Sequence, residues 1–203
     1  MANNQNNLEV EVKFFIPELA AFRERLLAAG AELAKPRIYE RNVRFDTEDE
    51  RLYKELSLLR LRQDTAVTLT YKGTPENLPH SEAKVREELE LQVSDFDTLA
   101  EIFTRLGFAP RQVYEKYRET FAWQDVEIVL DELPYGNFIE LEGDEAGIKT
   151  AVSHLNLNWQ ERILGNYLGL MAQLKAHHNL HFNDLTFANF ADRDISIADI
   201  LPY

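Results

Sequence analysis

Charged and apolar residues alternate along eight segments of the chain, with the period of two residues that is typical of half-buried β-strands. The segments are residues 8–16, 39–46, 57–62, 67–72, 84–93, 112–121, 126–131 and 138–142. Turn-forming residues separate several of them, such as the Leu-Pro-Tyr-Gly run at 133–136 and the short spacer at 63–65. The alternation therefore predicts eight strands, some of them joined by tight hairpins.

Helical spacing of apolar residues appears between these strands. Pro17 precedes a helical pattern over 18–29, and Gly30 stands where a C-terminal cap is expected. Asp95 begins a second helical segment that Gly107 ends, and two more helices are predicted over 145–155 and 159–176. The predicted order is strand, helix, four strands, helix, three strands and two helices, which indicates an α+β fold.

The charged residues of each predicted strand share one face. In the first segment Glu9, Glu11 and Lys13 lie on one face, because residues two apart in a strand point the same way. The acids on these faces are Glu9, Glu11, Glu88, Glu90, Asp131, Glu140 and Glu142. The bases on these faces are Lys13, Arg60, Arg62, Lys72, Arg86, Lys116 and Arg118. Each strand is therefore predicted to be charged on one side and apolar on the other.

The predicted helices can cover the apolar faces, and the charged faces must then point inward. A sheet of eight strands can close into a barrel that is wide enough for one small ligand. The alternative is a sandwich whose charged faces meet solvent. The sorting of charges disfavours it, since Glu-x-Glu occurs three times within the predicted strands and lysine-rich solvated edges are absent. We therefore predict an eight-stranded antiparallel β-barrel with helices packed on the outside.

A charged barrel interior needs ligands or pairing to be stable. Burial of seven unpaired carboxylates would cost far more free energy than folding supplies. Basic side chains bind phosphate oxygens, and carboxylates bind hard divalent cations. The pattern therefore favours a ligand that carries several phosphates together with metal ions.

Composition narrows the function classes further. The 203 residues suit one domain, and the net charge of −13 disfavours nucleic-acid binding. There are no cysteines, which excludes disulfides and thiolate metal sites. We expect no membrane span, no signal peptide and a cytoplasmic location. We further expect residues 1–7 to be a disordered lead-in, 8–175 the domain, and 176–203 an apolar extension that packs on the body or on a partner such as a second copy.

The segment from Glu9 to Lys13 resembles the E-x-E-x-K signature of the CYTH superfamily, also called triphosphate tunnel metalloenzymes. This family includes class IV adenylyl cyclases, thiamine triphosphatases and inorganic tripolyphosphatases. The resemblance continues in order through residues 45–47, 59–62, 70–73, 86–90, 115–118, 130–136, 138–142 and 166–167. It implies an eight-stranded tunnel that binds a triphosphate-containing small molecule with Mg²⁺ or Mn²⁺.

The resemblance also implies roles for the inward residues. Glu9, Glu11 and Lys13 of the signature are expected to be catalytic. The expected phosphate-binding residues are Lys13, Arg44, Arg60, Arg62, Lys72, Arg86, Lys116 and Arg118. The expected metal ligands are Glu9, Glu11, Glu88, Glu90, Asp131, Glu140 and Glu142. The chain departs from the family at Asn42 and Arg44, where many relatives have aspartate and tyrosine, and Arg44 is expected to add a phosphate contact.

Three functions are compatible with this interior. The first is metal-dependent hydrolysis of a triphosphate, either inorganic tripolyphosphate or an organic triphosphate. The alternative is a class IV adenylyl cyclase that converts ATP to cyclic AMP and pyrophosphate. The third is a sensor that binds polyphosphate or nucleotide without turnover. Hydrolysis is favoured over cyclisation because the sequence shows no set of residues for reading a base, and the full set of acids disfavours the sensor.

Overall fold

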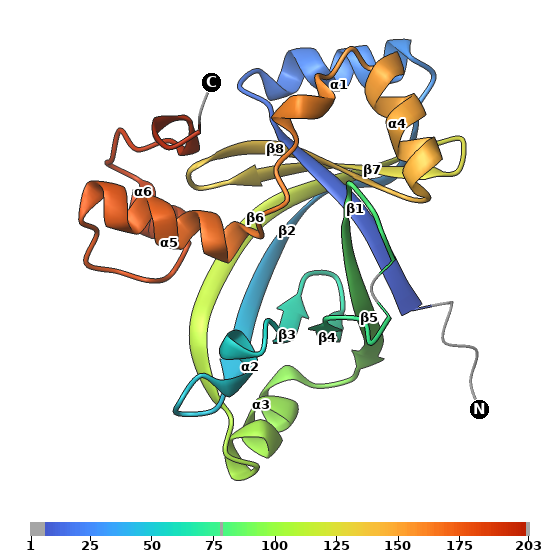
Figure 1. The fold of residues 1–203 in the computed structure, drawn as a ribbon. Coiled ribbons are helices and arrows are strands. Elements are labelled where there is room, and N and C mark those ends of the chain that lie inside the picture. The colour runs from blue at the N-terminus through green and yellow to red at the C-terminus, as the bar shows by residue number, and fades with distance from the viewer. Residues whose placement is uncertain (1–6, 78, 202–203) are drawn as a thin grey trace.

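Eight antiparallel strands close into a barrel in the computed structural model, which describes residues 7–77 and 79–201 (Figure 1). The order of neighbours around the barrel is β1-β5-β4-β3-β2-β6-β7-β8. The strands are β1 (Leu8–Phe15), β2 (Glu32–Asp46), β3 (Leu58–Gln63), β4 (Val67–Gly73), β5 (Lys84–Val93), β6 (Ala109–Trp123), β7 (Val126–Leu133) and β8 (Gly136–Glu142). The predicted fold class is confirmed. Residues 1–6 of the predicted lead-in lie outside the described residues.

Two of the hairpins lie where the breakers predicted them. The carboxylate of Asp64 accepts a hydrogen bond of 2.9 Å from the Ala66 amide and closes the turn between β3 and β4. Pro134 and Tyr135 join β7 to β8, and Gly136 follows with a φ of +149°. A Cβ atom at Gly136 would lie only 3.0 Å from a methyl group of Ile197, so both backbone conformation and space favour glycine there.

The structure corrects three local predictions. Strand β2 begins at Glu32 rather than at residue 39, because register shifts near Lys35 interrupt the alternation that marks a strand. The single turn of helix α2 (Arg51–Lys54) was not expected. The predicted helix over 159–176 is confirmed only from Tyr167 onward, where α5 (Tyr167–His178) begins. A short 3-10 turn, η2 (Trp159–Glu161), ends before Ile163 bridges to Lys13 in β1.

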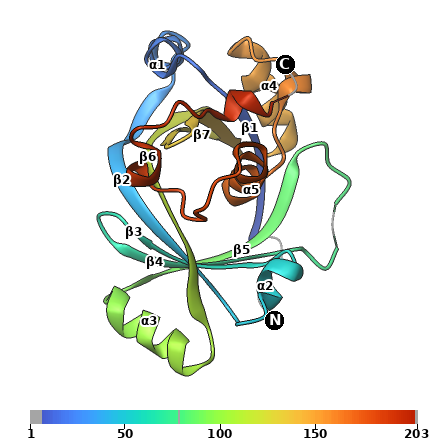
Figure 2. The same cartoon turned by 90° about the vertical axis from the view of Figure 1, so that its left-hand side faces the viewer.

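Three helices cover the outside of the barrel. Helices α1 (Leu19–Ala28) and α4 (Glu145–His154) pack on the outer faces of β1, β7 and β8, where Leu26, Leu141 and Ile148 are fully buried. Helix α3 (Phe96–Arg105) lies on the opposite side of the barrel in Figure 2 and covers β2 and β3, with Phe103 against Phe45. The apolar strand faces therefore point outward under helices, and the charged faces point into the barrel.

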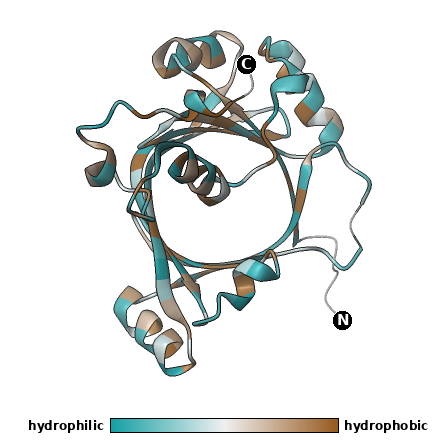
Figure 3. Cartoon of the chain, turned by 60° about the vertical axis from the view of Figure 1, so that its left-hand side comes forward, coloured by the Kyte–Doolittle hydropathy of each residue, from teal (hydrophilic) through white to brown (hydrophobic). Residues whose placement is uncertain are grey.

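Helix α5 (Tyr167–His178) packs at one end of the barrel rather than on its outer wall. Its side chains contact inward-facing aromatic residues such as Phe138 and Tyr114, which lie two positions from Glu140 and Lys116 on the same strand faces. Viewed along the barrel in Figure 3, the strands form a ring and α5 appears within its outline. An apolar cluster therefore fills part of this end, and the charged interior begins beyond it.

The chain after α5 covers an open strand edge. Strand β6 pairs with β7 only from Tyr117 onward, so its first half has a free edge on that side. Leu185 fills this edge: its amide donates to the Val113 carbonyl at 2.9 Å, and its carbonyl accepts from the Glu115 amide at 2.9 Å. The tail ends with α6 (Phe187–Phe190) and η3 (Ile197–Asp199), whose Ile197 amide donates to the Tyr135 carbonyl. Residues 179–201 thus pack on the body of the protein.

Among the helices of residues 7–77 and 79–201, none has the length and apolar character needed to cross a membrane.

We predict that Leu185→Ala destabilises the whole barrel. Leu185 is fully buried, and a leucine-to-alanine change in a packed core costs about 2–5 kcal/mol. Thermal unfolding followed by circular dichroism should show one transition at a lower temperature. Leu106→Ala is the control, since Leu106 is 67% exposed and its truncation should change stability by about 0.5 kcal/mol or less. A separate early transition in Leu185→Ala, with the main transition unchanged, would show that the tail is not part of the cooperative unit.

Candidate active site

The barrel interior contains a cavity of about 380 Å³, which is within the range of small-molecule sites. Its walls bring together residues from all eight strands. Asp131 of β7 is the one predicted site residue that does not line it. The residues predicted from sequence that line it are Glu9, Glu11, Lys13, Arg44, Arg60, Arg62, Lys72, Arg86, Glu88, Glu90, Lys116, Arg118, Glu140 and Glu142. The alternation of charge along the strands therefore found most of the charged residues that line this cavity.

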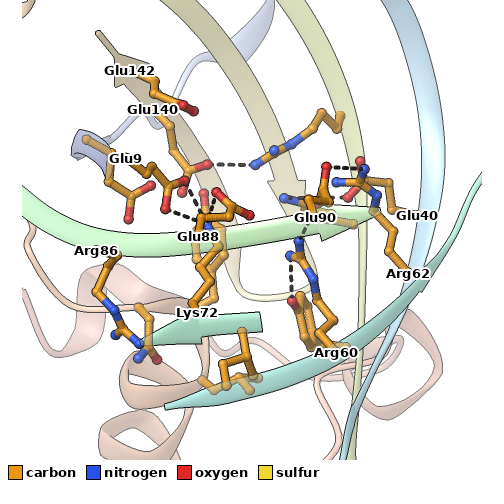
Figure 4. A pocket seen from close by; sticks show the side chains of 18 of the residues that line it. Glu9, Glu40, Arg60, Arg62, Lys72, Arg86, Glu88, Glu90, Glu140 and Glu142 are labelled. Carbon is orange, nitrogen blue, oxygen red and sulfur yellow. Dashed lines mark hydrogen bonds and ion pairs between the residues drawn. The ribbon is translucent and has the colours of Figure 1, made fainter. Parts of the chain in front are cut away.

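Acidic side chains gather on one side of the cavity. Figure 4 shows Glu9, Glu88, Glu140 and Glu142 together there, with Arg60 and Arg62 on the opposite side. Lys72 lies among the acids, with its Nζ 2.6 Å from Glu9 and 3.1 Å from Glu88. Burial lowers the pKa of the Lys72 ammonium and the two carboxylates raise it. The effect of the carboxylates is the larger, so the pKa is raised above its ordinary value. Lys72 is therefore a charged group that partly neutralises the acidic wall.

Among the described residues Glu142 forms no ion pair with a basic side chain, and its carboxyl is repelled by the other acids of this wall. Burial raises the pKa of its carboxyl to about 7, and the nearby carboxylates of Glu9 and Glu127 add to the effect. Glu127 lines the cavity opposite Glu142 in the register of β7 and β8 and was not predicted. It shares the inward phase of Asp131, four residues along β7, so the same alternation could have identified it.

Glu11 is held in the charged form by lysines. Burial by itself would raise the pKa of this carboxyl, but Lys13, Lys84 and Lys72 lower it to about 2, against an opposing effect of Glu140. Lys84 forms an ion pair with Glu11 across the β1–β5 register and was not predicted. It is the first residue of β5 and shares the inward phase of Arg86, so the alternation along the predicted strand 84–93 contained the signal.

A continuous network of ion pairs runs from β1 to β6. Lys13 Nζ lies 2.6 Å from Glu140, and the same carboxylate accepts a 2.6 Å hydrogen bond from Arg118 Nη2. Arg118 also binds Asp131 through two of its nitrogens, at 2.7 and 2.6 Å. Burial opposes the charge on Lys13, but Glu140 and Glu11 raise its pKa above the ordinary value. Lys13 and Arg118 are therefore fixed cations on the cavity wall.

Asp131 differs from the other predicted metal ligands. Its side chain is fully buried and does not reach the cavity, because Lys116, Arg118 and Tyr167 all donate hydrogen bonds to its carboxylate. These donors occupy the lone pairs that a cation would need. The position of Asp131 instead suits it to orient Lys116 and Arg118.

The basic wall lies on β2, β3 and β6. Arg60 donates to the Tyr114 hydroxyl at 3.1 Å and to Thr70 at 2.9 Å, and its buried Nε has no hydrogen-bond partner among the described residues. Arg62 and Arg60 lie 3.6 and 3.5 Å from Glu90. Arg60 therefore retains a donor for a ligand even while its terminal nitrogens contact the protein.

Glu40 is an acid on the basic wall that sequence reasoning missed. Burial would raise the pKa of its carboxyl, but Lys116, Arg118, Arg62 and Arg60 together lower it to about 2. It lies on the same face of β2 as Arg44, so the period-2 pattern contained the signal. It lies outside every segment that resembles a family motif.

Two predicted phosphate-binding arginines contact protein acceptors at one edge of the cavity. Arg44 binds Asp46 at 3.0 Å and Glu50 at 2.7 Å. Arg86 donates to the carbonyl oxygens of Gly73 at 2.9 Å and Leu56 at 2.6 Å. Both guanidinium groups thus tie strand residues to the segment around α2 and would have to exchange partners to reach a phosphate.

The donor chemistry of the acidic wall fits a hard divalent cation, but its geometry is not that of a preformed cage. Within the described part of the chain, no group of three or more His, Asp or Glu side chains is arranged to hold a metal ion. These carboxylates are not arranged around a cation because lysines form ion pairs with Glu9, Glu11 and Glu140. Unpaired Glu142, with its raised pKa, is where a cation would relieve the most repulsion.

Comparison with known proteins gives the same fold. The model of the CYTH domain family matches residues 7–156. A "putative adenylate cyclase" of Methanocaldococcus jannaschii is 31% identical over 137 residues, which is 66% of this chain and 76% of that protein.

Solved structures of similar fold come from several organisms. A "putative adenylate cyclase" from Vibrio parahaemolyticus superposes with a TM-score of 0.68 at 19% identity and covers 79% of this chain and 95% of its own. A protein from Pyrococcus horikoshii has a TM-score of 0.68 at 24% identity, with coverage of 81% and 98%. A "putative adenylyl cyclase" from Hippeastrum, described as having a dominant triphosphatase activity, has a TM-score of 0.54 at 19% identity, with coverage of 78% and 91%.

We predict that Glu142→Gln stabilises the metal-free protein at pH 8 but not at pH 4. The folded state binds the Glu142 proton more tightly than the unfolded state, so this group costs stability as the pH rises from 4.5 to about 7. The pKa shift of Glu142 corresponds to a loss of at most about 3 kcal/mol in the free energy of unfolding, and partial exposure of the side chain reduces this loss to about 1–2 kcal/mol. Thermal unfolding in EDTA should show the glutamine variant melting about 4 °C higher at pH 8.

Glu24→Gln provides the matched control for this measurement, because the Glu24 side chain is 76% exposed. It should shift the melting temperature by the same small amount at both pH values. If Glu142→Gln behaves like this control, the pKa of the Glu142 carboxyl is not raised in the folded protein.

Proposed function

The chain belongs to the CYTH domain family, and from that premise we propose that it is a metal-dependent enzyme that hydrolyses a phosphoanhydride bond of a triphosphate held inside the barrel. Members of this family process triphosphates and are generally metal-dependent. The observation that carries the proposal is the division of one cavity into an acidic wall and a basic wall. A triphosphate with a bound cation presents the complementary charges to both walls.

The bases would bind the phosphate oxygens. Lys13, Arg60, Arg62, Lys72, Lys116 and Arg118 line the cavity from four strands, so they would surround a linear chain of phosphates rather than grip one end. Arginine and lysine form charge-assisted hydrogen bonds with phosphate oxygens. Arg44 and Arg86 lie at the edge of the same cavity and would join once they leave their present acceptors.

The acids would hold the cation. Glu9, Glu11, Glu88, Glu90, Glu140 and Glu142 remain the candidate ligands for Mg²⁺ or Mn²⁺, and Asp131 is better placed to orient neighbouring cations. A bound divalent cation supplies charge neutralisation and lowers the pKa of a coordinated water. Glu142 is the strongest of these candidates because no lysine forms an ion pair with it in the described part of the chain and its pKa is raised.

Catalysis by the protein itself would come from fixed cations. Negative charge spreads over the equatorial oxygens as a phosphoryl group is transferred, and donors that are already in place stabilise it without reorganisation. Glu140 and Asp131 hold Lys13 and Arg118 in fixed positions on the wall. Lys13, from the E-x-E-x-K segment, is therefore proposed as a catalytic residue that contacts the reacting phosphate, with Glu9 and Glu11 as metal ligands in the same segment.

An adenylyl cyclase is the second candidate. Its support is the name of the relative from Methanocaldococcus jannaschii, which is 31% identical to this chain. Cyclisation additionally needs a site that orients the ribose and base, whereas hydrolysis requires only the charged cavity. For that reason we place hydrolysis first.

The proposal predicts orthophosphate release from tripolyphosphate in the presence of Mg²⁺ or Mn²⁺. The purified protein should be incubated with tripolyphosphate and with ATP in parallel, and orthophosphate, pyrophosphate and cyclic AMP should be resolved by chromatography. Turnover should disappear in EDTA and return when the cation is added. Formation of cyclic AMP with an equal amount of pyrophosphate would show that the protein is an adenylyl cyclase and not a hydrolase. Tight binding of tripolyphosphate or ATP without any product would show that it is a sensor.

Lys13→Ala is expected to lower kcat at least about 100-fold, since loss of one fixed donor to a developing negative charge typically has this effect. Arg118 still pairs with Glu140 in this variant, so the fold should be retained, which circular dichroism can check. Lys149→Ala is the control, because Lys149 pairs with Glu82 and Glu145 on the exterior. Unchanged turnover in a folded Lys13→Ala protein would remove β1 from the active site.

A further inference from the structure

Tyr167 is a cavity residue to which neither the strand pattern nor the mechanism above gives a role. It is the first residue of α5 and lies beyond the segment that the family model matches. The side chain lines the cavity although the residue is only 8% exposed. It is thus a contact between the helix at the end of the barrel and the charged wall.

The hydroxyl of Tyr167 is bonded to the ion-pair network. It donates to Asp131 Oδ2 at 2.8 Å, and the same oxygen accepts from Lys116 at 3.0 Å and from Arg118 at 2.6 Å. Three donors therefore converge on one buried oxygen. Without the tyrosine donor, this oxygen would draw Lys116 and Arg118 more strongly, and both cations would turn further from the cavity.

The ring of Tyr167 contacts the same cations from another side. Lys13 Nζ lies 4.4 Å from the ring centroid, and Lys116 Nζ lies 5.5 Å from it. Cation–π attraction is stronger where the ammonium is shielded from water, and both lysines are buried. The ring therefore contacts two bases that line the cavity, and the hydroxyl reaches the third, Arg118, through Asp131.

The tyrosine remains a donor at working pH. Burial raises the pKa of Tyr167 well above its ordinary value, and Asp131 and Glu140 raise it further. The facing charged groups on β1, β6, β7 and β8 are Lys13, Lys116, Arg118, Asp131 and Glu140, and the neutral phenol is compatible with all of them.

We propose that Tyr167 is a positioning residue that aims Lys13, Lys116 and Arg118 at the phosphates, so that the site is complete only when α5 is seated in the end of the barrel. This inference rests on the proposed function in one respect, since it takes these three cations as phosphate ligands. It adds that residues 166–167, which resemble the family but lie beyond the matched range 7–156, set the orientation of these cations at the start of α5.

The seating of α5 has its own anchors. The Tyr135 hydroxyl donates to the Tyr167 carbonyl at 3.0 Å, and the Asn166 side chain caps the helix by accepting from the Gly169 amide at 2.7 Å. Leu170, Met171 and Leu174 pack in the apolar cluster with Tyr135 and Phe138. Tyr135 offers a matched comparison because its buried hydroxyl holds the same residue but does not contact the cations or line the cavity.

The test compares Tyr167→Phe with Tyr135→Phe. Tripolyphosphate binding is measured by calorimetry in EDTA, and steady-state turnover is measured with Mg²⁺. In Tyr167→Phe we expect binding about tenfold weaker and KM about tenfold higher, with kcat changed less than threefold. In Tyr135→Phe we expect both constants within twofold of wild type, while the melting temperatures of the two variants fall by similar amounts. Tyr167→Leu, which also loses the ring, should bind more weakly than Tyr167→Phe.

Equal binding constants for wild type and Tyr167→Phe would overturn the inference, as would equal losses in both phenylalanine variants. The binding arm separates this result from the proposed function. Wild-type protein that binds tripolyphosphate without hydrolysing it refutes the hydrolase but still allows the variants to be compared. Wild-type protein that does not bind tripolyphosphate refutes the assignment of the three cations as phosphate ligands, and the inference falls with it.

Discussion

The need to compensate buried charge governs this structure. Carboxylates and ammonium groups that leave water lose several kcal/mol of solvation each, and only close, well-directed partners recover that loss. The interior meets this need with a network in which Glu140 and Asp131 lie between Lys13, Arg118 and Lys116. A closed barrel suits this arrangement because it leaves no strand edge within the network and brings β1 next to β8. The outer helices then bury the apolar faces that the inward charges leave outside.

The same constraint connects structure to the proposed chemistry. Most of the cavity's bases are paired with its acids, for example Lys72 with Glu9 and Glu88. A triphosphate would take over the role of the acids toward the bases, and a divalent cation would take over the role of the bases toward the acids. Binding would therefore be an exchange of partners that keeps the interior neutral. Glu142, whose pKa is raised to about 7, marks the place where compensation is incomplete without a cation.

The C-terminal part of the chain links the stability of the barrel to its site. Leu185 covers the free edge of β6, and Ile197 binds the β7–β8 turn at Tyr135. These contacts enclose α5, whose first residue reaches Asp131. Packed side chains therefore connect the C-terminal tail, through α5, to the charged wall. A small displacement of α5 would change the positions of the cations, because a closely packed interior transmits strain.

The alternation of charged and apolar residues predicted the barrel and most of its charged lining, because the period of two along a strand fixes which residues share a face. Glu9, Lys13 and Arg118 were placed correctly for this reason alone. The same rule places Glu40 on the inward face of β2 beside Arg44, although Glu40 belongs to none of the family motifs. Other features depended on contacts between distant segments. Only the fold revealed that Asp131 is enclosed by three donors, that a bridge from Ile163 to Lys13 interrupts the predicted last helix, and that α5 enters the end of the barrel. Periodicity reports the environment of a strand face, whereas the partner that occupies a given lone pair is decided by tertiary packing.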